Sequence, residues 1–143
     1  MSVLEHLTKL QVDQLIKSLK SLQECLPIEM PEFGRIKDDT NVIGVYDGIE
    51  YKLHRYRHPL EKERFSIHLR FKETNAHLIR LDIKNGRHRN PDGTIIGQNH
   101  IHIYTDSNYA KDAFAYPLPT EFTDLESIFE ALEQFLSYTN IQR

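Results

Sequence analysis

A strict alternation of apolar and polar side chains in the middle of the chain constrains its fold more than any other feature. In RFSIHLRFK, residues 64–72, the apolar side chains are Phe65, Ile67, Leu69 and Phe71. A repeat of two residues places successive side chains on opposite faces of an extended strand. The segment is therefore predicted to be a β-strand with one face in the core and one polar face.

The same alternation predicts about four further strands. Residues 41–58, NVIGVYDGIEYKLHRYRH, indicate two strands joined at Asp47-Gly48, a dipeptide typical of tight hairpin turns. Residues 77–85, HLIRLDIKN, and residues 99–105, NHIHIYT, each indicate one more strand, and turn residues at 85–86 and 91–93 separate them. The apolar side chains of these two strands are Ile79, Leu81, Ile83, Ile101 and Ile103.

Helical spacing flanks the strands on both sides. Residues 7–26 begin with a Thr8/Gln11 capping box, and Pro27 and Pro31 follow them. Residues 123–139 begin with a Thr123/Glu126 capping box. One helix is expected over each segment, since apolar side chains recur at steps of three and four. These side chains are Val12, Leu15, Ile16, Leu19, Leu22 and Leu26 in the first segment and Leu125, Ile128, Phe129, Leu132, Phe135 and Leu136 in the second.

These elements predict a single domain over residues 1–143 with an α+β fold. In this fold, an antiparallel sheet of about five strands carries the N- and C-terminal helices packed on one face. The other face is expected to be open and polar, as is common for antiparallel sheets. A chain of 143 residues is long enough to bury a core of this kind.

The composition favours a cytoplasmic protein that does not contact a membrane. No apolar run approaches the roughly 20 residues that span a bilayer. The first ten residues, MSVLEHLTKL, lack the pattern of a secretion signal. The single cysteine, Cys25, excludes an intrachain disulfide framework and fits a reducing compartment.

Charge is segregated along the chain. Residues 51–90 hold eleven Lys and Arg against four acidic residues, whereas the net charge of the whole chain is −3. A basic centre between acidic ends favours a surface that faces a polyanion such as RNA. The alternative is that the strands display Lys and Arg on a solvated face.

The polar face of the predicted sheet carries side chains suited to RNA cleavage. Cleavage of RNA by its own 2′-hydroxyl needs a base, an acid, and cations that stabilise the extra phosphate charge. The predicted catalytic residues are His100 and His102 as acid and base, Tyr104 as a further donor, and Arg70 and Arg80 as phosphate ligands. The predicted substrate-binding residues are His68, Lys84, Arg87, His88 and Arg89. The alternative is a polar face stabilised by cross-strand pairs.

A metal site is the second interpretation of the same residues. His100 and His102 share one face of a strand, and Asp82, His68 or His88 can complete a ligand set. A bare His-x-His is common, however, and the glutamate that follows it in cupin-like metal barrels is missing from IYTDSNY, residues 103–109. The prediction therefore includes no metal and no cofactor.

Residues 79–104, IRLDIKNGRHRNPDGTIIGQNHIHIY, with KDAFAYPL at 111–118, resemble a signature of small uncharacterised bacterial and phage proteins. That signature reads approximately as Asn-Gly-x-x-His-Arg-Asn-Pro-Asp-Gly, then His-x-His-Ile-Tyr and an aromatic residue before Ala. The aromatic residue here is Phe114, where the signature has Trp. The resemblance implies membership of a bacterial or mobile-element family and assigns no activity.

The sequence is compatible with two functions. The leading prediction is an RNA-directed protein of toxin type, a metal-independent endoribonuclease whose partners are RNA and a cognate antitoxin. The second is a phage or mobile-element inhibitor without catalytic activity, of the anti-CRISPR type, which binds a host defence protein or a ribonucleoprotein. Histidines and arginines that converge on one phosphate favour the first, whereas a broad surface that tolerates loss of any one histidine favours the second.

Overall fold

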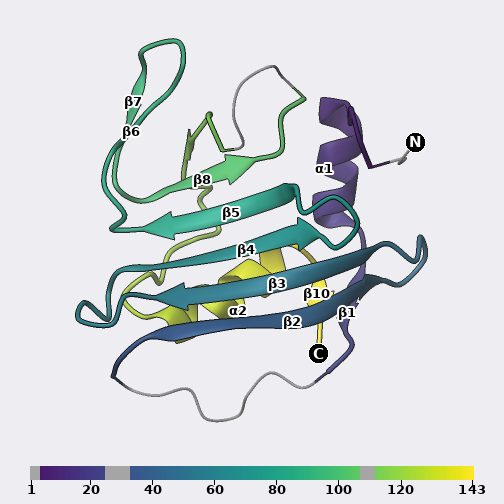
Figure 1. The fold of residues 1–143 in the computed structure, drawn as a ribbon, viewed down its shortest axis with the longest axis horizontal. Helices are drawn as coiled ribbons and strands as arrows, with labels where there is room; N and C mark the ends of the chain where they lie inside the picture. The colour runs from purple at the N-terminus through teal and green to yellow at the C-terminus, as the bar shows by residue number, and fades with distance from the viewer. Residues whose placement is uncertain (1–3, 25–32, 107–111) are drawn as a thin grey trace.

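The fold is built around one eight-stranded sheet, shown in Figure 1. The computed structural model describes residues 4–24, 33–106 and 112–143. In spatial order the strands are β10 (Ile141–Gln142), β1 (Lys20–Leu22), β2 (Ile36–Gly44), β3 (Glu50–Arg57), β4 (Phe65–Phe71), β5 (His77–Ile83), β8 (His100–Ile103) and β9 (Tyr116–Pro117). Neighbouring strands are antiparallel except β10 and β1, which are parallel. The remaining strands, β6 (His88–Arg89) and β7 (Ile95–Ile96), form a separate hairpin.

The predicted α+β fold is confirmed, but the sheet is larger than the predicted five strands. The strands β2, β3, β4, β5 and β8 are the five that the alternation indicates. The three additional strands, β1, β9 and β10, contain only two or three residues each. So short a segment cannot display a repeat of two, and for this reason the sequence pattern does not reveal it.

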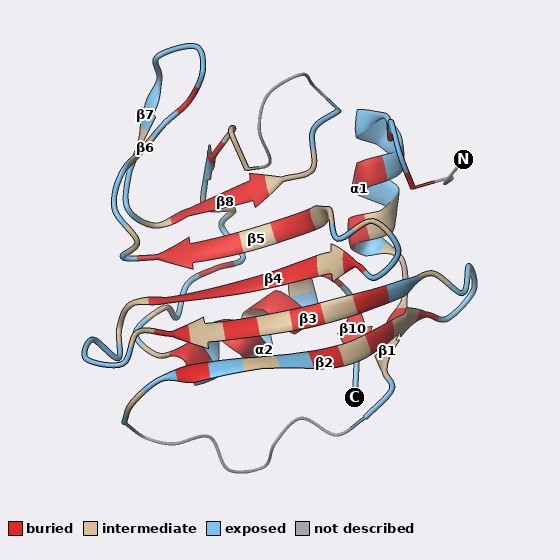
Figure 2. Ribbon diagram, viewed as in Figure 1, coloured by how far each residue is buried: buried red, intermediate tan, exposed pale blue. Residues whose placement is uncertain are grey.

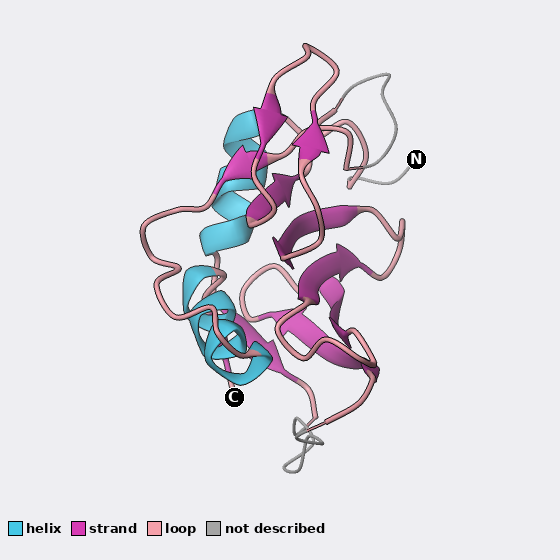
Figure 3. Cartoon of the chain, turned by 90° about the vertical axis from the view of Figure 1, so that its left-hand side faces the viewer, coloured by secondary structure: helices cyan, strands magenta, loops and turns pink. Residues whose placement is uncertain are grey.

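The two helices, α1 (Lys9–Lys17) and α2 (Ile128–Tyr138), lie on the same side of the sheet, as Figure 3 shows. Their buried side chains and those of the strands form one hydrophobic cluster, which includes Val12, Leu69, Leu81 and Phe135. Burial of this apolar surface is the main contribution to the stability of the fold. No helix in the described ranges has the length and apolar character needed to cross a bilayer.

The first helix is shorter than predicted. The Thr8/Gln11 capping box is present, but the helix ends at Lys17. The buried Nζ of Lys20 donates hydrogen bonds to the carbonyl oxygens of Ile16 (2.9 Å), Ser18 (2.8 Å) and Thr139 (2.8 Å). These bonds satisfy carbonyl groups at the C-terminal ends of both helices. The chain therefore enters β1, although Leu19 and Leu22 continue the apolar spacing of the helix. Residues 25–32, which include Cys25, Leu26, Pro27 and Pro31, lie outside the described residues.

The second helix begins later than predicted. Ser127 is its N-cap, and the Ser127 side chain accepts a hydrogen bond from the Glu130 backbone N–H. The predicted Thr123/Glu126 capping box is wrong, because Thr123 instead exchanges hydrogen bonds with the Gln134 side chain. Residues 123–127 therefore form the loop that leads into α2.

The sheet face opposite the helices is polar but only partly open. Burial alternates along β3, whereas β4, β5 and β8 are buried along most of their length (Figure 2). Near β8, His102 Nδ1 donates to the carbonyl of Phe114 (2.9 Å), and Asn90 exchanges two hydrogen bonds with Ala115. The 113–115 segment and the β6–β7 hairpin therefore cover this end of the sheet, and the predicted open face is wrong there.

Candidate functional site

Cross-strand pairing gathers most of the histidines on one surface. One row across the sheet runs from Asp39 through His54, His68 and Arg80 to His102, and the next row contains Asp82 opposite His100. We call this surface the histidine face. It is the side of β2, β3, β4, β5 and β8 that lies opposite the helices. Two residues from outside these strands, His88 and Asp112, also belong to it. The strand residues on it are Asp39, His54, His68, Arg70, His77, Arg80, Asp82, His100 and His102.

An aspartate–histidine pair lies at the β2–β3 end of this face. His54 Nδ1 is 2.8 Å from Asp39 Oδ1. Arg70 donates from Nη1 and Nη2 to the two carboxylate oxygens of Asp39, at 3.0 and 3.1 Å. These hydrogen bonds lower the pKa of Asp39 to about 2, with His54 adding to the effect against partial burial. Asp39 is therefore ionised at neutral pH and orients the His54 ring.

His68 lies next to this pair and stacks between two other rings. The ring centroid of His68 is 4.8 Å from that of His54 and 4.0 Å from that of His77. Arg70 Nη1 donates to His68 Nε2 at 3.1 Å. Burial, followed by repulsion from His77 and His54, lowers the pKa of His68 to about 2. His68 is therefore a neutral spacer between His54 and His77.

A second aspartate–histidine pair lies on the other side of His68. His77 Nδ1 is 2.9 Å from Asp112 Oδ2, and Arg80 Nη1 is 3.5 Å from the same oxygen. Burial opposes ionisation of Asp112, but the hydrogen bond with His77 keeps the pKa of Asp112 below its usual range. The two pairs thus share one arrangement. Arg70 forms an ion pair with the aspartate of the His54 pair, and Arg80 with the aspartate of the His77 pair.

A third group is buried at the β5–β8 end of the face. The side chains of Asp82, His100 and His102 are 5%, 3% and 5% exposed. Asp82 Oδ2 is 3.1 Å from His102 Nε2 and 3.5 Å from His100 Nε2. Burial raises the pKa of Asp82, but the bonds to the two histidines outweigh it and leave that pKa well below its usual range. His88 reaches this group from the β6–β7 hairpin, with its ring centroid 4.9 Å from that of His102.

The structure brings together six of the ten predicted site residues and separates the rest. Tyr104 is not on the histidine face. The register shifts by one residue between Leu69 and Arg70, so that the consecutive residues Leu78 and Ile79 are both buried in the core. Tyr104 lies opposite Leu78, with its N–H bonded to the Leu78 carbonyl, and its ring packs edge-on against Phe71. The prediction that Tyr104 lies on the polar face beside the histidines is therefore wrong. The six that gather are His68, Arg70, Arg80, His88, His100 and His102.

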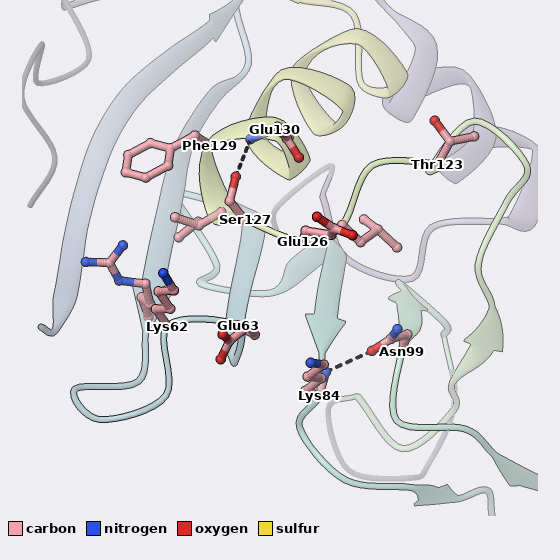
Figure 4. A pocket seen from close by; sticks show the side chains of 12 residues that line it. Lys62, Glu63, Lys84, Asn99, Thr123, Glu126, Ser127, Phe129 and Glu130 are labelled. Atoms are coloured by element: carbon pink, nitrogen blue, oxygen red, sulfur yellow. Dashed lines mark hydrogen bonds between the residues drawn. The ribbon is translucent and has the colours of Figure 1, made fainter. Parts of the chain in front are cut away.

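Lys84 also lies elsewhere, in a cavity of about 770 Å³ beside the N-terminus of α2 (Figure 4). A positive φ of 55° at Lys84 ends the alternation of β5, and the Lys84 N–H donates to Asn99 Oδ1 at 2.9 Å. The lining of this cavity carries three cations, Arg57, Lys62 and Lys84, and three carboxylates, Glu63, Glu126 and Glu130. Because these charges balance, the cavity does not favour a polyanion, and the predicted grouping of Lys84 with the histidines is wrong.

The Lys and Arg residues of segment 51–90 do not form one surface. Arg55 and Arg57 lie on the helix-covered side of the sheet, and each is 1% exposed. Arg55 pairs with Asp38 through Nε (2.8 Å) and Nη2 (2.5 Å), and Arg57 Nε donates to the Gly34 carbonyl. Arg87 and Arg89 are exposed near the β6–β7 hairpin, where substrate binding by them stays a prediction. The local charge that matters for the histidine face is therefore that of Arg70 and Arg80.

The lowered pKa of His68 predicts a specific loss of stability in acid. The unfolded chain takes up a proton at His68 below pH about 6.5, whereas the folded chain resists it down to a pKa of about 2. The contribution of His68 to the free energy of unfolding should fall by up to about 1.4 kcal/mol per pH unit as pH drops below 6.5. Chemical denaturation of His68→Phe between pH 7 and 4.5 should show a shallower slope than wild type. His6→Phe, at an exposed histidine, should keep the wild-type slope.

The predicted site contains none of the four residues of the two aspartate–histidine pairs. The alternation along β3 places His54 on the polar face, so the sequence pattern could have predicted that His54 belongs to the site. His77 reaches the face only because of the register shift in β5, which the sequence does not indicate. Asp39 is brought close by strand pairing, and Asp112 by a loop.

Comparison with known proteins gives a family but no activity. The sequence matches a family of unknown function, DUF6978, over residues 7–141. No curated protein and no solved structure shows significant similarity to the chain. Because the family match covers nearly the whole chain, the predicted resemblance to an uncharacterised family is confirmed. The chain belongs to DUF6978, a family of unknown function.

Proposed function

We propose that the protein is an RNA-directed endoribonuclease that acts through the two aspartate–histidine pairs of the histidine face. One observation carries the proposal. Asp39–His54 and His77–Asp112 flank the neutral ring of His68, and a guanidinium accompanies each pair. Two oriented imidazoles separated by a neutral ring supply a base and an acid on opposite sides of one bound phosphate.

The proposed reaction uses the 2′-hydroxyl of RNA as the nucleophile. One histidine of the pair His54 and His77 removes the proton from the 2′-hydroxyl, whose oxygen attacks the adjacent phosphorus. The P–O5′ bond breaks, and the other histidine gives its proton to the departing 5′-oxygen. The products are a 2′,3′-cyclic phosphate and a 5′-hydroxyl, so atoms and charge balance without an added reagent.

Arg70 and Arg80 are suited to hold the phosphate during this reaction. Their side chains are 19% and 33% exposed, and each makes an ion pair on the histidine face. A guanidinium has five N–H donors, so the hydrogen bonds to Asp39, His68 and Asp82 and the ion pair with Asp112 do not use all of them. Planar donors of this kind match phosphate oxygens and stabilise the charge that develops on them.

The proposal changes the roles given to His100 and His102 by the sequence pattern. Each ring donates from Nδ1 to a backbone carbonyl, of Gly97 (2.7 Å) and Phe114 (2.9 Å), and directs Nε2 toward Asp82. Neither ring has the exposure needed to meet a phosphodiester. His54 and His77 are partly exposed, and each uses Nδ1 for its aspartate, which leaves Nε2 as the nitrogen for proton transfer.

The test is cleavage of RNA by the purified protein, assayed both with and without a metal chelator. Wild type should cut RNA to products ending in 2′,3′-cyclic phosphate, and should not cut DNA of the same sequence, which lacks the nucleophile. His54→Gln should cleave far more slowly, whereas His58→Gln, at a histidine that only accepts turn N–H groups, should cleave like wild type. Absence of cleavage on free RNA and on ribosomes would contradict the proposal and leave a non-catalytic inhibitor as the better account.

A further inference from the structure

The buried end of the histidine face forms a second group that the proposed cleavage does not use. His88, His100 and His102 each direct one ring nitrogen into a common space, and these nitrogens lie within 4.8 Å of one another. Asp82 Oδ2 lies beside two of these histidines, 3.1 Å from His102 Nε2 and 3.5 Å from His100 Nε2. Three imidazoles therefore converge, and a carboxylate adjoins two of them.

The outer nitrogen of each imidazole is fixed by a backbone carbonyl. His88 Nε2 bonds to Ala113 O (2.7 Å), His100 Nδ1 to Gly97 O (2.7 Å) and His102 Nδ1 to Phe114 O (2.9 Å). A carbonyl only accepts hydrogen bonds, so each of these nitrogens carries the proton. When such a ring is neutral, as a metal ligand must be, its other nitrogen holds a lone pair. Histidines that ligate a metal show this same arrangement, with the outer N–H donated to a carbonyl or carboxylate.

These lone pairs are placed to bind a cation in the space that they share. Nε2 of His100 and Nε2 of His102 face the carboxylate of Asp82 at 3.5 and 3.1 Å, so nitrogen and oxygen ligands would hold the cation together. Their separations already suit a metal. In a tetrahedral zinc site with bonds of about 2.0–2.1 Å, adjacent ligand atoms are roughly 3.3 Å apart. The two Asp82–histidine separations match this value, and the nitrogens need to approach by roughly 1.5 Å at most.

We propose that Asp82, His88, His100 and His102 bind one Zn²⁺ ion with tetrahedral geometry. Nitrogen ligands with one carboxylate suit zinc, whereas Mg²⁺ and Ca²⁺ prefer all-oxygen sites. Because Asp82, His100 and His102 are almost fully buried, the site is closed and the role of the ion is structural. This inference does not depend on the proposed ribonuclease activity.

The ion would join parts of the chain that are distant in sequence. Asp82 lies on β5, His100 and His102 on β8, and His88 on the β6–β7 hairpin. The carbonyls of Ala113 and Phe114 add the segment that follows Asp112. Zinc would therefore fix the hairpin and the Asp112 segment against the sheet, beside the His77–Asp112 pair.

The test is metal binding by the purified full-length chain. Protein freed of metal with a chelator is titrated with Zn²⁺ in competition with a chromophoric chelator, and the bound metal is counted by mass spectrometry. Wild type should take up one Zn²⁺ per chain. Co²⁺ in its place should give the intense visible absorption of a tetrahedral site. Both measurements use the wild-type chain, so neither depends on a variant that folds.

Variants locate the site. His102→Ala and His88→Ala should each bind Zn²⁺ at least about 100-fold more weakly, the upper range for changes one step outside a ligand shell. His88 lies outside the hydrophobic cluster, so His88→Ala should keep the wild-type circular dichroism spectrum. His58→Ala, outside this group, should bind like wild type. Absence of stoichiometric binding, wild-type affinity in both ligand variants, or the weak absorption of octahedral Co²⁺ would overturn the inference.

Discussion

Replacing Asp82 with Ala should lower the free energy of unfolding by about 3–5 kcal/mol, the largest effect on stability expected from a single polar residue on the histidine face. Asp82 is nearly fully buried and accepts hydrogen bonds from Arg80 Nε (3.0 Å) and Asn85 Nδ2 (3.2 Å). The same carboxylate faces His100 and His102. Its removal leaves Arg80 Nε and Asn85 Nδ2 without this acceptor and removes the negative charge that offsets Arg80.

The measurement is urea denaturation of wild type and Asp82→Ala in a metal chelator, so that a bound ion does not contribute to the difference. Asp13→Ala, at an exposed aspartate on α1, should change the free energy of unfolding by no more than about 0.5 kcal/mol. A loss below about 1 kcal/mol in Asp82→Ala would show that the Asp82 hydrogen bonds do not organise this end of the face.

The largest effect on activity should follow from loss of either partly exposed histidine. His54→Ala and His77→Ala should each lower the rate of RNA cleavage by about 10²–10⁴-fold, the usual contribution of a positioned acid or base. The double variant should be little slower than the slower single variant, because groups that act in one step are not additive. Single-turnover cleavage of one RNA oligonucleotide under identical conditions measures all three rates.

A modified substrate separates the acid from the base. Sulfur in place of the bridging 5′-oxygen gives a leaving group that departs without a proton. The variant that lacks the general acid should cleave this substrate almost as fast as wild type, whereas the variant that lacks the base should stay slow. Recovery of both variants, or of neither, would contradict the division of roles between His54 and His77.

Sequence alone predicted the sheet and its polar face because both depend on local alternation. In β4, apolar side chains at every second position determine which residues enter the core, and His68 and Arg70 follow on the other face. The same reasoning placed Arg80, His100 and His102 correctly. The hairpin at Asp47-Gly48 was also indicated, but residues 45–49 form its loop and of the dipeptide only Gly48 has a positive φ (69°), so the tight two-residue turn is not formed.

The composition of the site could not be predicted in the same way, because long-range contacts determine it. The register shift that turns His77 toward His68 and Tyr104 toward Phe71 has no local signature. Asp112 is 35 positions from His77. Burial of His100 and His102 depends on the segment near Phe114, which folds back over β8. Alternation predicts on which face a side chain lies, but tertiary packing determines whether that face is open.

The central claim, that the His54–His68–His77 part of the histidine face meets the RNA phosphate, is most directly tested by NMR of the imidazole C–H groups. The chain is titrated with an RNA oligonucleotide that carries 2′-O-methyl groups and so binds without being cut, and signals are assigned from His→Gln variants. The imidazole signals of His54 and His77 should shift as the oligonucleotide saturates, while those of His6 and His58 should stay in place. Unchanged His54 and His77 signals at saturation, or shifts confined to His6 and His58, would contradict the account.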